Sequence, residues 1–516
     1  MYSSTLGYYG YASSLFYGDL FMYPFALLNA IGVDILISYK LMCLCLWAAI
    51  FISAGFSMRR ICKSQQAADI AIFVYMVLGV CYSNVAGAAI GRAVACIFIP
   101  IAILGIYQIL ESPGRLDWIY LAVGVAGTVC FQVIDGVICV TVLALIFLAS
   151  IRKVRLIHIW KIVKAIALCL LLSAWFVLPM LEQLADNTFF VTSSDVPLGK
   201  TSIGNYTIPL IGWFFPRKVV YVIARLLGNE YLQSHLYGFG YLAMAVGAVV
   251  LIKAGKKVMS NGFYIAMFIT IIFSVWFQTR LFPHDAVQSL IGVMQFPWRL
   301  ATVGTLALAI VSGKLYLAEA GRWKKLTLAI LVVTTWCGML VFVSSVGWHL
   351  GLMIFSDDYS ETVYDFDSYS IGSAEYLPEQ LYVYDADNTA AYKDYLLERG
   401  DTVVSDNEGI STQCARDGCK TIIEYSENDG VAILELPLVM YKGYYAVDLE
   451  TEEEVPVSIS EHGLVQIEVS NAFGEVAVWY KGTTLQSVSY IFSGISFAML
   501  VVYVFLLRKR KGRATV

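Results

Sequence analysis

The stretch "IGRAVACIFIPIAILGIYQIL" (90–110) decides the class of this protein. A helix needs about 20 mainly apolar residues to cross a bilayer, and the only charged side chain in this stretch is Arg92, near its start. Of the 516 residues in the chain, 59% are hydrophobic and only 14% are charged, with a mean hydropathy of +0.69. A soluble domain carries about 25% charged residues. The sequence therefore predicts a polytopic α-helical membrane protein.

Similar apolar stretches recur on both sides of this one, and together they predict about eleven membrane helices. We expect these helices at 35–57, 69–88, 90–110, 116–133, 136–150, 162–181, 237–252, 261–279, 298–318, 326–346 and 488–507. Two of them, 136–150 and 237–252, are short, so one is alternatively a re-entrant or tilted segment. The pattern predicts a transmembrane domain of about ten helices at 35–346, followed by a final helix and a basic tail at 488–516.

The positions of Lys and Arg predict the orientation, because short cytoplasmic loops are enriched in them. The tail "RKRKGRATV" (508–516) is strongly basic, which predicts a cytoplasmic C-terminus in a multi-pass protein of the cell membrane. Counting back span by span, every connection on that side contains a basic residue. The segments expected on the opposite, extracytoplasmic side are 1–34, about 182–236, 280–297 and 347–487.

The N-terminal segment 1–34 has neither the charged start nor the apolar core of a signal peptide. An extracytoplasmic position therefore requires an upstream anchor, and we expect a further membrane helix before Met1. We interpret 20–32 as an amphipathic helix on the outer surface; the alternative is that it is a poor membrane span and that the topology starts inside.

Segment 347–487 is acidic, and its second half alternates apolar with polar residues. The stretches 420–427, 430–438, 443–450, 455–460, 463–470 and 475–482 predict short strands separated by turn signals such as "NDG" and "EHG". They predict a β-rich sandwich-like or jelly-roll-like domain outside the membrane, between the last two helices. Its function is open between a cap or spacer and a module that binds carbohydrate or acceptor. We expect its aromatic residues to be core rather than sugar-binding.

Motifs for familiar chemistry are missing from the sequence. We find no zinc signature, P-loop, dinucleotide fingerprint or Ser-His-Asp arrangement, so no cofactor is indicated, and a role for a divalent metal stays open. Cys414 and Cys419 flank a turn and could form a hairpin disulfide in an oxidising compartment. We expect the lipid bilayer as a partner and no nucleic acid.

Polar residues on the predicted outer face are the main candidates for function. "GVMQFPWRLATVG" (292–304) places Arg299 where a membrane helix begins, and ionisable residues at membrane depth are usually functional. Pro297 suits the first turn of a helix, Trp298 suits the membrane interface, and exposed N–H groups at the helix start favour an anion. Arg299 is therefore either part of an anion site or a side chain that reaches the lipid headgroups.

Several segments resemble one bacterial membrane-protein family. They are "GYASSLFYGDLFMYPFALL" (10–28), "SYK" (38–40), the stretch at 90–110, "QFPWRL" (295–300) and "YKGYYAV" (441–447). The resemblance is to the YfhO-like family, which overlaps the group called "6-pyruvoyl-tetrahydropterin synthase related" membrane proteins and is similar to the GT-C integral-membrane glycosyltransferases. Its most specific parts are "LFYGDLF" and "QFPWR".

The resemblance implies transfer of a sugar from a polyprenyl-phosphate donor to a cell-envelope glycan acceptor at the outer membrane face. The expected catalytic residue is Asp19, as a base or positioning group, with helix capping as the alternative. The expected substrate-binding residues are Tyr17, Arg92, Arg280, Gln295, Trp298 and Arg299.

The sequence departs from the family pattern in two respects. An arginine five residues before an acid is replaced by Gly87 and Arg92, and the first span with its acidic loop is absent. These departures favour a truncated or inactive copy. Two other functions stay open: a transporter or flippase for a lipid-linked sugar or anionic solute, and a non-catalytic envelope scaffold.

Overall fold

A computed structural model describes residues 5–77, 89–193, 203–207, 261–318, 374–382, 391–407 and 409–513, with five single residues between 325 and 336. The chain divides into two compact units. Unit 1 comprises 1–17, 174–200 and 357–516, and unit 2 comprises 18–173 and 201–356. The predicted helix 237–252, most of 326–346 and the end of 69–88 lie outside the described residues.

The chain is a helical, multi-pass membrane protein. Five helical segments are long and apolar enough to cross a bilayer: Ile35–Cys62, Ile90–Glu111, Leu156–Asp186, Pro297–Leu317 and Thr484–Leu507. Each contains or closely matches a predicted span. The predicted spans 116–133, 136–150 and 261–279 form shorter apolar helices: α7 (Asp117–Phe131), α8 (Val133–Ala149) and α12 (Gly262–Phe277). The remaining helices of unit 2 include α2 (Tyr23–Ala30), α3 (Ile35–Cys62), α4 (Gln65–Val77), α6 (Ile90–Glu111), the first part of α9 (Leu156–Asp186) and α14 (Ala301–Ala318).

Two glycines explain how closely α6 and α7 pack. A Cβ at Gly105 of α6 would lie 2.3 Å from the backbone nitrogen of Leu121 in α7. A Cβ at Gly124 of α7 would lie 2.3 Å from the backbone nitrogen of Ala102 in α6. Such small residues let helix backbones approach in a membrane, where van der Waals packing drives association.

The helix ends of unit 2 fall into two groups, which we call the Arg92 end and the Lys153 end. At the Arg92 end, the first turn of α6 contacts that of α8 through Arg92 and Asp135. At the Lys153 end, Lys153 after α8 pairs with Glu111 at the end of α6, and Tyr316 near the end of α14 donates to Gln66 at the start of α4. The helices α6, α8 and α14 therefore start at the Arg92 end, whereas α4 starts at the Lys153 end and runs in the opposite direction.

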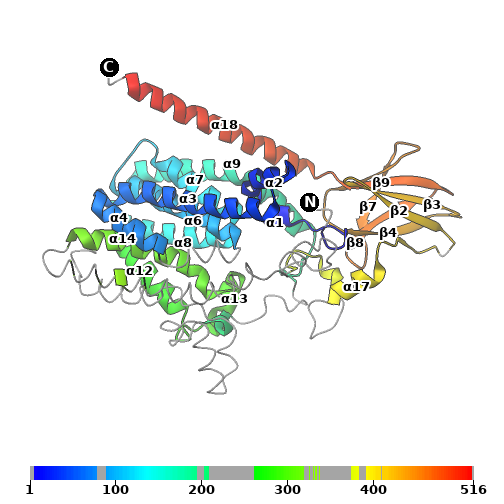
Figure 1. Ribbon diagram of the computed structural model, residues 1–516, viewed down its shortest axis with the longest axis horizontal. Coiled ribbons are helices and arrows are strands. Elements are labelled where there is room, and N and C mark those ends of the chain that lie inside the picture. The colour runs from blue at the N-terminus through cyan, green and yellow to red at the C-terminus, as the bar shows by residue number, and fades with distance from the viewer. Residues whose placement is uncertain are drawn as a thin grey trace. The chain divides into compact units, whose positions relative to one another are not determined.

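The β-rich region of unit 1 consists of two antiparallel sheets (Figure 1). One has the strand order β1-β4-β8-β7, and the other has the order β2-β3-β9-β5-β6. The strands are β1 (Val404–Ser405), β2 (Ser411–Asp417), β3 (Lys420–Ser426), β4 (Ala432–Val439), β5 (Tyr444–Asp448), β6 (Glu454–Val455), β7 (Val457–Ile459), β8 (Leu464–Val469) and β9 (Gly474–Tyr480). Side chains such as Ile423, Leu434, Ile467 and Val478 form one apolar core. This region also lies before the last helix, α18 (Thr484–Arg513), so the predicted β-rich region is confirmed.

The aromatic residues of this region are partly core, as expected. Tyr441 is 1% exposed, whereas Tyr445 and Trp479 form a half-buried cross-strand pair with ring centroids 5.1 Å apart. Lys481 lies over the Tyr445 ring and Lys420 lies over the Trp479 ring, at 4.1 and 4.9 Å. Because the ammonium groups lie over these rings, the pair is better explained as a cation–π surface than as an open sugar platform.

Segment 1–34 is divided between the two compact units. Residues 1–17 belong to unit 1, where Tyr9 is fully buried, accepts from Val439 N through its carbonyl at 2.9 Å, and donates through its hydroxyl to Gly400 O at 2.6 Å. Aromatic residues of segment 1–17, such as Tyr9, are therefore part of the buried core of unit 1. Residues 18–34 belong to unit 2; there α2 forms, but none of its residues is buried.

The predicted disulfide between Cys414 and Cys419 is wrong, because both cysteines are free. Asp417 pairs with Lys420 in the β2–β3 hairpin, so Cys419 lies in the two-residue turn and Cys414 lies inside β2. Three strand residues separate Cys414 from the turn, or ~10 Å at about 3.4 Å per residue, which exceeds the usual Cα separation in a disulfide.

Candidate functional site

A buried carboxylate organises the Arg92 end of unit 2. Asp135 lies in the first turn of α8 and is 1% exposed. Its Oδ2 is 3.4 Å from Nε of Arg92, in the first turn of α6. Arg92 also donates from its other side to Oγ1 of Thr302 in α14, at 3.2 Å. Three helices of unit 2 are thereby joined by one polar network.

Arg299 adds a second cation to this network. It lies in the 3-10 helix η9 (Pro297–Leu300), which leads into α14, and is 9% exposed. It donates from Nη2 to Oε1 of Gln295 at 2.6 Å, and its charge acts on Asp135 together with that of Arg92. The positive charges of two guanidinium groups therefore act on the same buried carboxylate.

The helix termini strengthen this positive charge. α6 begins at Ile90 and α8 at Val133, while η9 begins at Pro297 and continues into α14. The N-terminus of a helix carries a partial positive charge and unpaired N–H groups. Arg92, Asp135 and Arg299 all lie within one turn of such a start. The electrostatics of the site favour an anion.

Aromatic rings form one wall beside Arg299. The rings of Phe296 and Trp298 stack with centroids 4.5 Å apart and an interplanar angle of 11°. Tyr206 contacts both edge-on, at 5.0 and 6.1 Å, and the Arg299 guanidinium carbon lies 5.6 Å from the Phe296 centroid. The wall holds η9 and limits the directions open to the guanidinium.

A strained turn positions the acceptor of Arg299. Gln295 has a φ of 58° and a ψ of −45°, and the N–H of Phe296 donates to Met294 O at 2.6 Å. This hydrogen bond spans a three-residue γ-turn of the rare type with positive φ. Backbone strain of this kind collects at functional sites.

Asp19 lies at the same end of unit 2. Its neighbour Gly18 packs on the last turn of α7, where an added Cβ would clash with the carbonyl oxygen of Cys130. Gly91, the neighbour of Arg92, packs on the next carbonyl, that of Phe131. Asp19 is the N-cap residue of the 3-10 helix η1 (Leu20–Met22), but no backbone N–H donates to its side chain there, which leaves the helix-capping alternative without support.

The contacts described so far include neither Arg280 nor Tyr17. Arg280 is exposed in the turn that follows α12. Tyr17 belongs to unit 1, where its hydroxyl donates to Glu375 and its ring meets that of Tyr376 edge-on. Gly87, the position of the departure from the family pattern, lies outside the described residues. The predicted residues that belong to one end of unit 2 are thus Asp19, Arg92, Gln295, Trp298 and Arg299, together with the exposed Arg280, since α12 ends beside η9.

Sequence reasoning missed Asp135. The signal was present as a lone acid between apolar stretches, in "CFQVIDGVICV" (130–140). Among the described residues, its Oδ1 has no hydrogen-bond partner although it is buried. A buried acceptor is costly without a partner, and a ligand hydroxyl would supply one. The described part of the chain contains no group of three or more His, Cys, Asp or Glu residues that could hold a metal ion.

Comparisons with protein-family models, with curated proteins and with solved structures find no match for this chain.

Proposed function

We propose that this protein binds a phosphate-bearing, lipid-linked sugar at the Arg92 end of unit 2 and acts as a GT-C-like glycosyltransferase of the YfhO-like family. The observation that carries the proposal is that two arginines, Arg92 and Arg299, act on the buried carboxylate of Asp135 at the starts of three helical segments. Arginine donates forked hydrogen bonds that match phosphate oxygens, and the helix starts add to the positive field.

The position of the site supports a reaction at the membrane surface. Its three charged residues lie in the first turns of helices, whereas transporters commonly bind substrates near the bilayer midplane. A polyprenyl-phosphate donor could keep its lipid in the bilayer and its phosphate at this level. We therefore favour group transfer over translocation.

The proposed transfer breaks the bond between the anomeric carbon and the phosphate oxygen, and it forms a bond between that carbon and an acceptor hydroxyl oxygen. The departing phosphate keeps the electron pair of the broken bond, and the guanidinium groups of Arg92 and Arg299 stabilise its negative charge. The proton of the acceptor hydroxyl goes to a carboxylate, for which Asp19 is the proposed base.

The test is binding of a polyprenyl-phosphate sugar to the purified protein and to the variants Arg299→Ala and Arg299→Lys. Arg299→Ala should weaken binding by roughly 2–5 kcal/mol, because a buried charge partner is lost. Arg299→Lys should not restore it, because lysine keeps the charge and loses the fork. Arg60→Ala, which removes an exposed arginine of α3, is the matched control.

Two further ligands separate the contributions of phosphate and lipid. Polyprenyl phosphate without sugar should compete with the donor, and neutral polyprenol should not. Equal binding by wild type, Arg299→Ala and Arg299→Lys would reduce "QFPWR" to a membrane anchor and reject the proposed donor site.

A further inference from the structure

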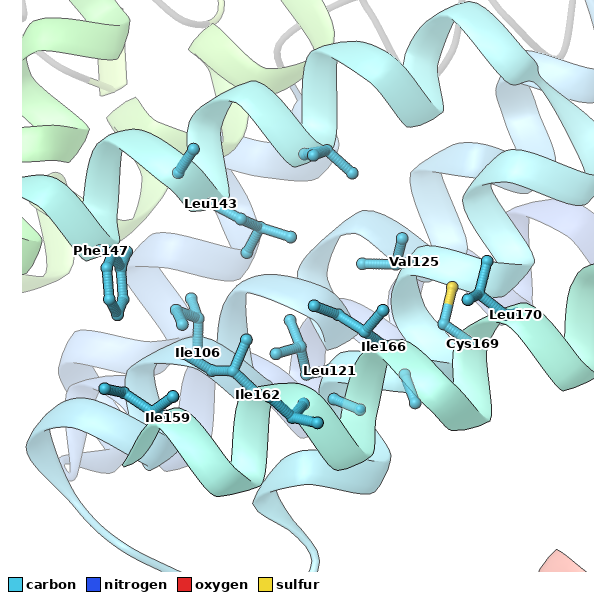
Figure 2. A pocket seen from close by; sticks show the side chains of 15 residues that line it. Ile106, Leu121, Val125, Leu143, Phe147, Ile159, Ile162, Ile166, Cys169 and Leu170 are labelled. Atoms are coloured by element: carbon cyan, nitrogen blue, oxygen red, sulfur yellow. The ribbon is translucent and has the colours of Figure 1, made fainter. Parts of the chain in front are cut away.

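Unit 2 contains an apolar cavity of about 440 Å³ between α6, α7, α8 and α9. Figure 2 shows the side chains that converge on it, including Leu121 of α7, Leu143 of α8 and Ile162 of α9. All fifteen lining residues are apolar. Several of them, such as Ile159, Ile166 and Leu170, are also 44–64% exposed. The cavity is therefore a groove open to the surroundings of the helices.

The groove is about as long as one bilayer leaflet is thick. Along α9 its lining runs from Ile159 to Leu170, which is ~16 Å at about 1.5 Å per helical residue. The hydrocarbon core of a bilayer is about 30 Å thick, so this length corresponds to roughly half of it. A hydrocarbon chain fits such a groove by length and by polarity, and a polar solute does not.

Basic residues lie where the groove reaches the Lys153 end. α8 and α9, which both line it, are joined through the 3-10 helix η2 (Ile151–Lys153), and Arg152, Lys153 and Arg155 are all exposed. Lys153 pairs with Glu111 at 3.1 Å, whereas the described residues give Arg152 and Arg155 no acidic partner. Trp160, 57% exposed, adds an aromatic side chain of the kind that lies at headgroup level.

We propose that this groove binds an anionic phospholipid of the surrounding bilayer, with an acyl chain between α8 and α9 and its phosphate against Arg152 and Arg155. Basic surfaces beside membrane helices bind anionic headgroups in this way. The lipid is distinct from the proposed sugar donor, because the groove reaches the Lys153 end and the buried arginines lie at the Arg92 end. The lipid site can therefore be tested independently of the proposed function.

The test uses the full-length protein in mild detergent, with native mass spectrometry to count bound lipids. Wild type should retain phosphatidylglycerol in preference to phosphatidylcholine. Ala144→Phe should abolish the adduct, because Ala144 lines the groove on its exposed side and a ring would occupy the groove. Val137→Phe, at another exposed position of α8 that does not line the groove, should leave the adduct unchanged.

A double variant separates the contribution of the lipid headgroup to binding from that of the acyl chain, because it leaves the groove unchanged. Arg152→Ala with Arg155→Ala should lower phosphatidylglycerol affinity roughly 30-fold and leave phosphatidylcholine affinity unchanged. Equal retention of both lipids by wild type would overturn the proposal. An unchanged adduct in Ala144→Phe, or an unchanged lipid preference in the double variant, would also overturn it.

Discussion

The carboxylate of Asp135 lies 3.4 Å from Nε of Arg92, although 43 residues separate them in the chain. The contact joins the first turns of α6 and α8. The Asp135 side chain is 1% exposed and the Arg92 side chain is 13% exposed. Arg299 lies within electrostatic range of the same carboxylate. Two positive charges therefore act on one buried carboxylate where α6, α8 and η9 meet.

Asp135→Asn should destabilise unit 2, because it leaves the largely buried guanidinium group of Arg92 without the carboxylate that pairs with it. Removal of one partner from a buried ion pair lowers the free energy of unfolding by about 3–5 kcal/mol. Thermal unfolding in detergent measures this loss. Asp69→Asn, at an exposed carboxylate of α4, should stay within about 0.5 kcal/mol of wild type. A similar shift for both variants would contradict a central role for Asp135.

Gly105→Ala should reduce the yield of folded protein, because the new Cβ would lie 2.3 Å from the backbone of Leu121 in α7. Overpacking of this kind costs about 1–3 kcal/mol when the neighbours can move, and here the neighbour is backbone. Size-exclusion chromatography of a fluorescent fusion measures the folded fraction. Gly494→Ala in α18, where a Cβ meets nothing within 4 Å, is the control and should behave as wild type.

The sequence predicted elements whose signal is local. Apolar length placed the helices, and alternation placed β3, β4, β5, β7, β8 and β9 within a few residues, but not the two-residue strands β1 and β6. It missed β2, whose "STQCARD" is polar and mostly exposed, because a strand without a buried face lacks a strong alternation signal. The division of segment 1–34 between the two units could not be predicted from local sequence patterns either, because the burial of Tyr9 depends on residues several hundred positions later.

The candidate site was predictable only in part, for the same reason. Arg92 and Arg299 stand out as arginines beside apolar stretches, and both proved to be largely buried. Asp135 falls in the short turn between two predicted spans, where an acid is unremarkable without knowledge of its neighbours. Its importance comes from the meeting of α6, α8 and η9, which is a tertiary feature.

The β-rich region should lose stability in acid. Burial alone would raise the pKa of Glu435, but hydrogen bonds from Ser460 and His462 and the charge of Arg399 outweigh it and hold this pKa below its ordinary value of 4.5. The folded state thus binds the proton more weakly than the unfolded state. The stabilisation is complete above pH 4.5 and is lost as the pH falls through the lower, folded pKa.

Hydrogen exchange of the strand peptides, corrected for its intrinsic pH dependence, checks this expectation. Glu435→Gln should weaken protection at neutral pH and flatten its dependence on pH in the acidic range. Glu468→Gln, at an exposed position of β8, should keep the wild-type pH profile. An identical acid response in wild type and Glu435→Gln would assign the acid loss to other groups.

We expect the Lys153 end to face the cytoplasm and the Arg92 end to face outward. Reporters fused after Lys63, Lys257 and Lys325 should read cytoplasmic, and reporters within 182–236 and 347–487 should read external. The physical reason is the excess of Lys and Arg in the connections on one side. A cytoplasmic reading for the 400–480 region would reverse the orientation and place the arginine site on the inner face.

Gln295 combines backbone strain with a functional hydrogen bond, and two substitutions separate them. Glycine adopts positive φ without steric cost, so Gln295→Gly relieves the strain, whereas Gln295→Ala retains it. Both variants remove the acceptor of the Arg299 guanidinium. We expect Gln295→Gly to be more stable than Gln295→Ala by about 1–3 kcal/mol in thermal unfolding.

Binding should respond differently from stability. Because both variants leave Arg299 without the Gln295 oxygen that orients it, both should bind a polyprenyl-phosphate sugar more weakly than wild type, and by a similar factor. A hydrogen bond to a charged group is worth about 1.5–3 kcal/mol, or roughly 10- to 150-fold in affinity. If Gln295→Gly instead bound as tightly as wild type, the turn would matter only as a backbone feature, and Gln295 would not position Arg299. If the strained turn positions an anion-binding arginine, the two Gln295 variants should differ in stability. They should also lose binding affinity to the same extent.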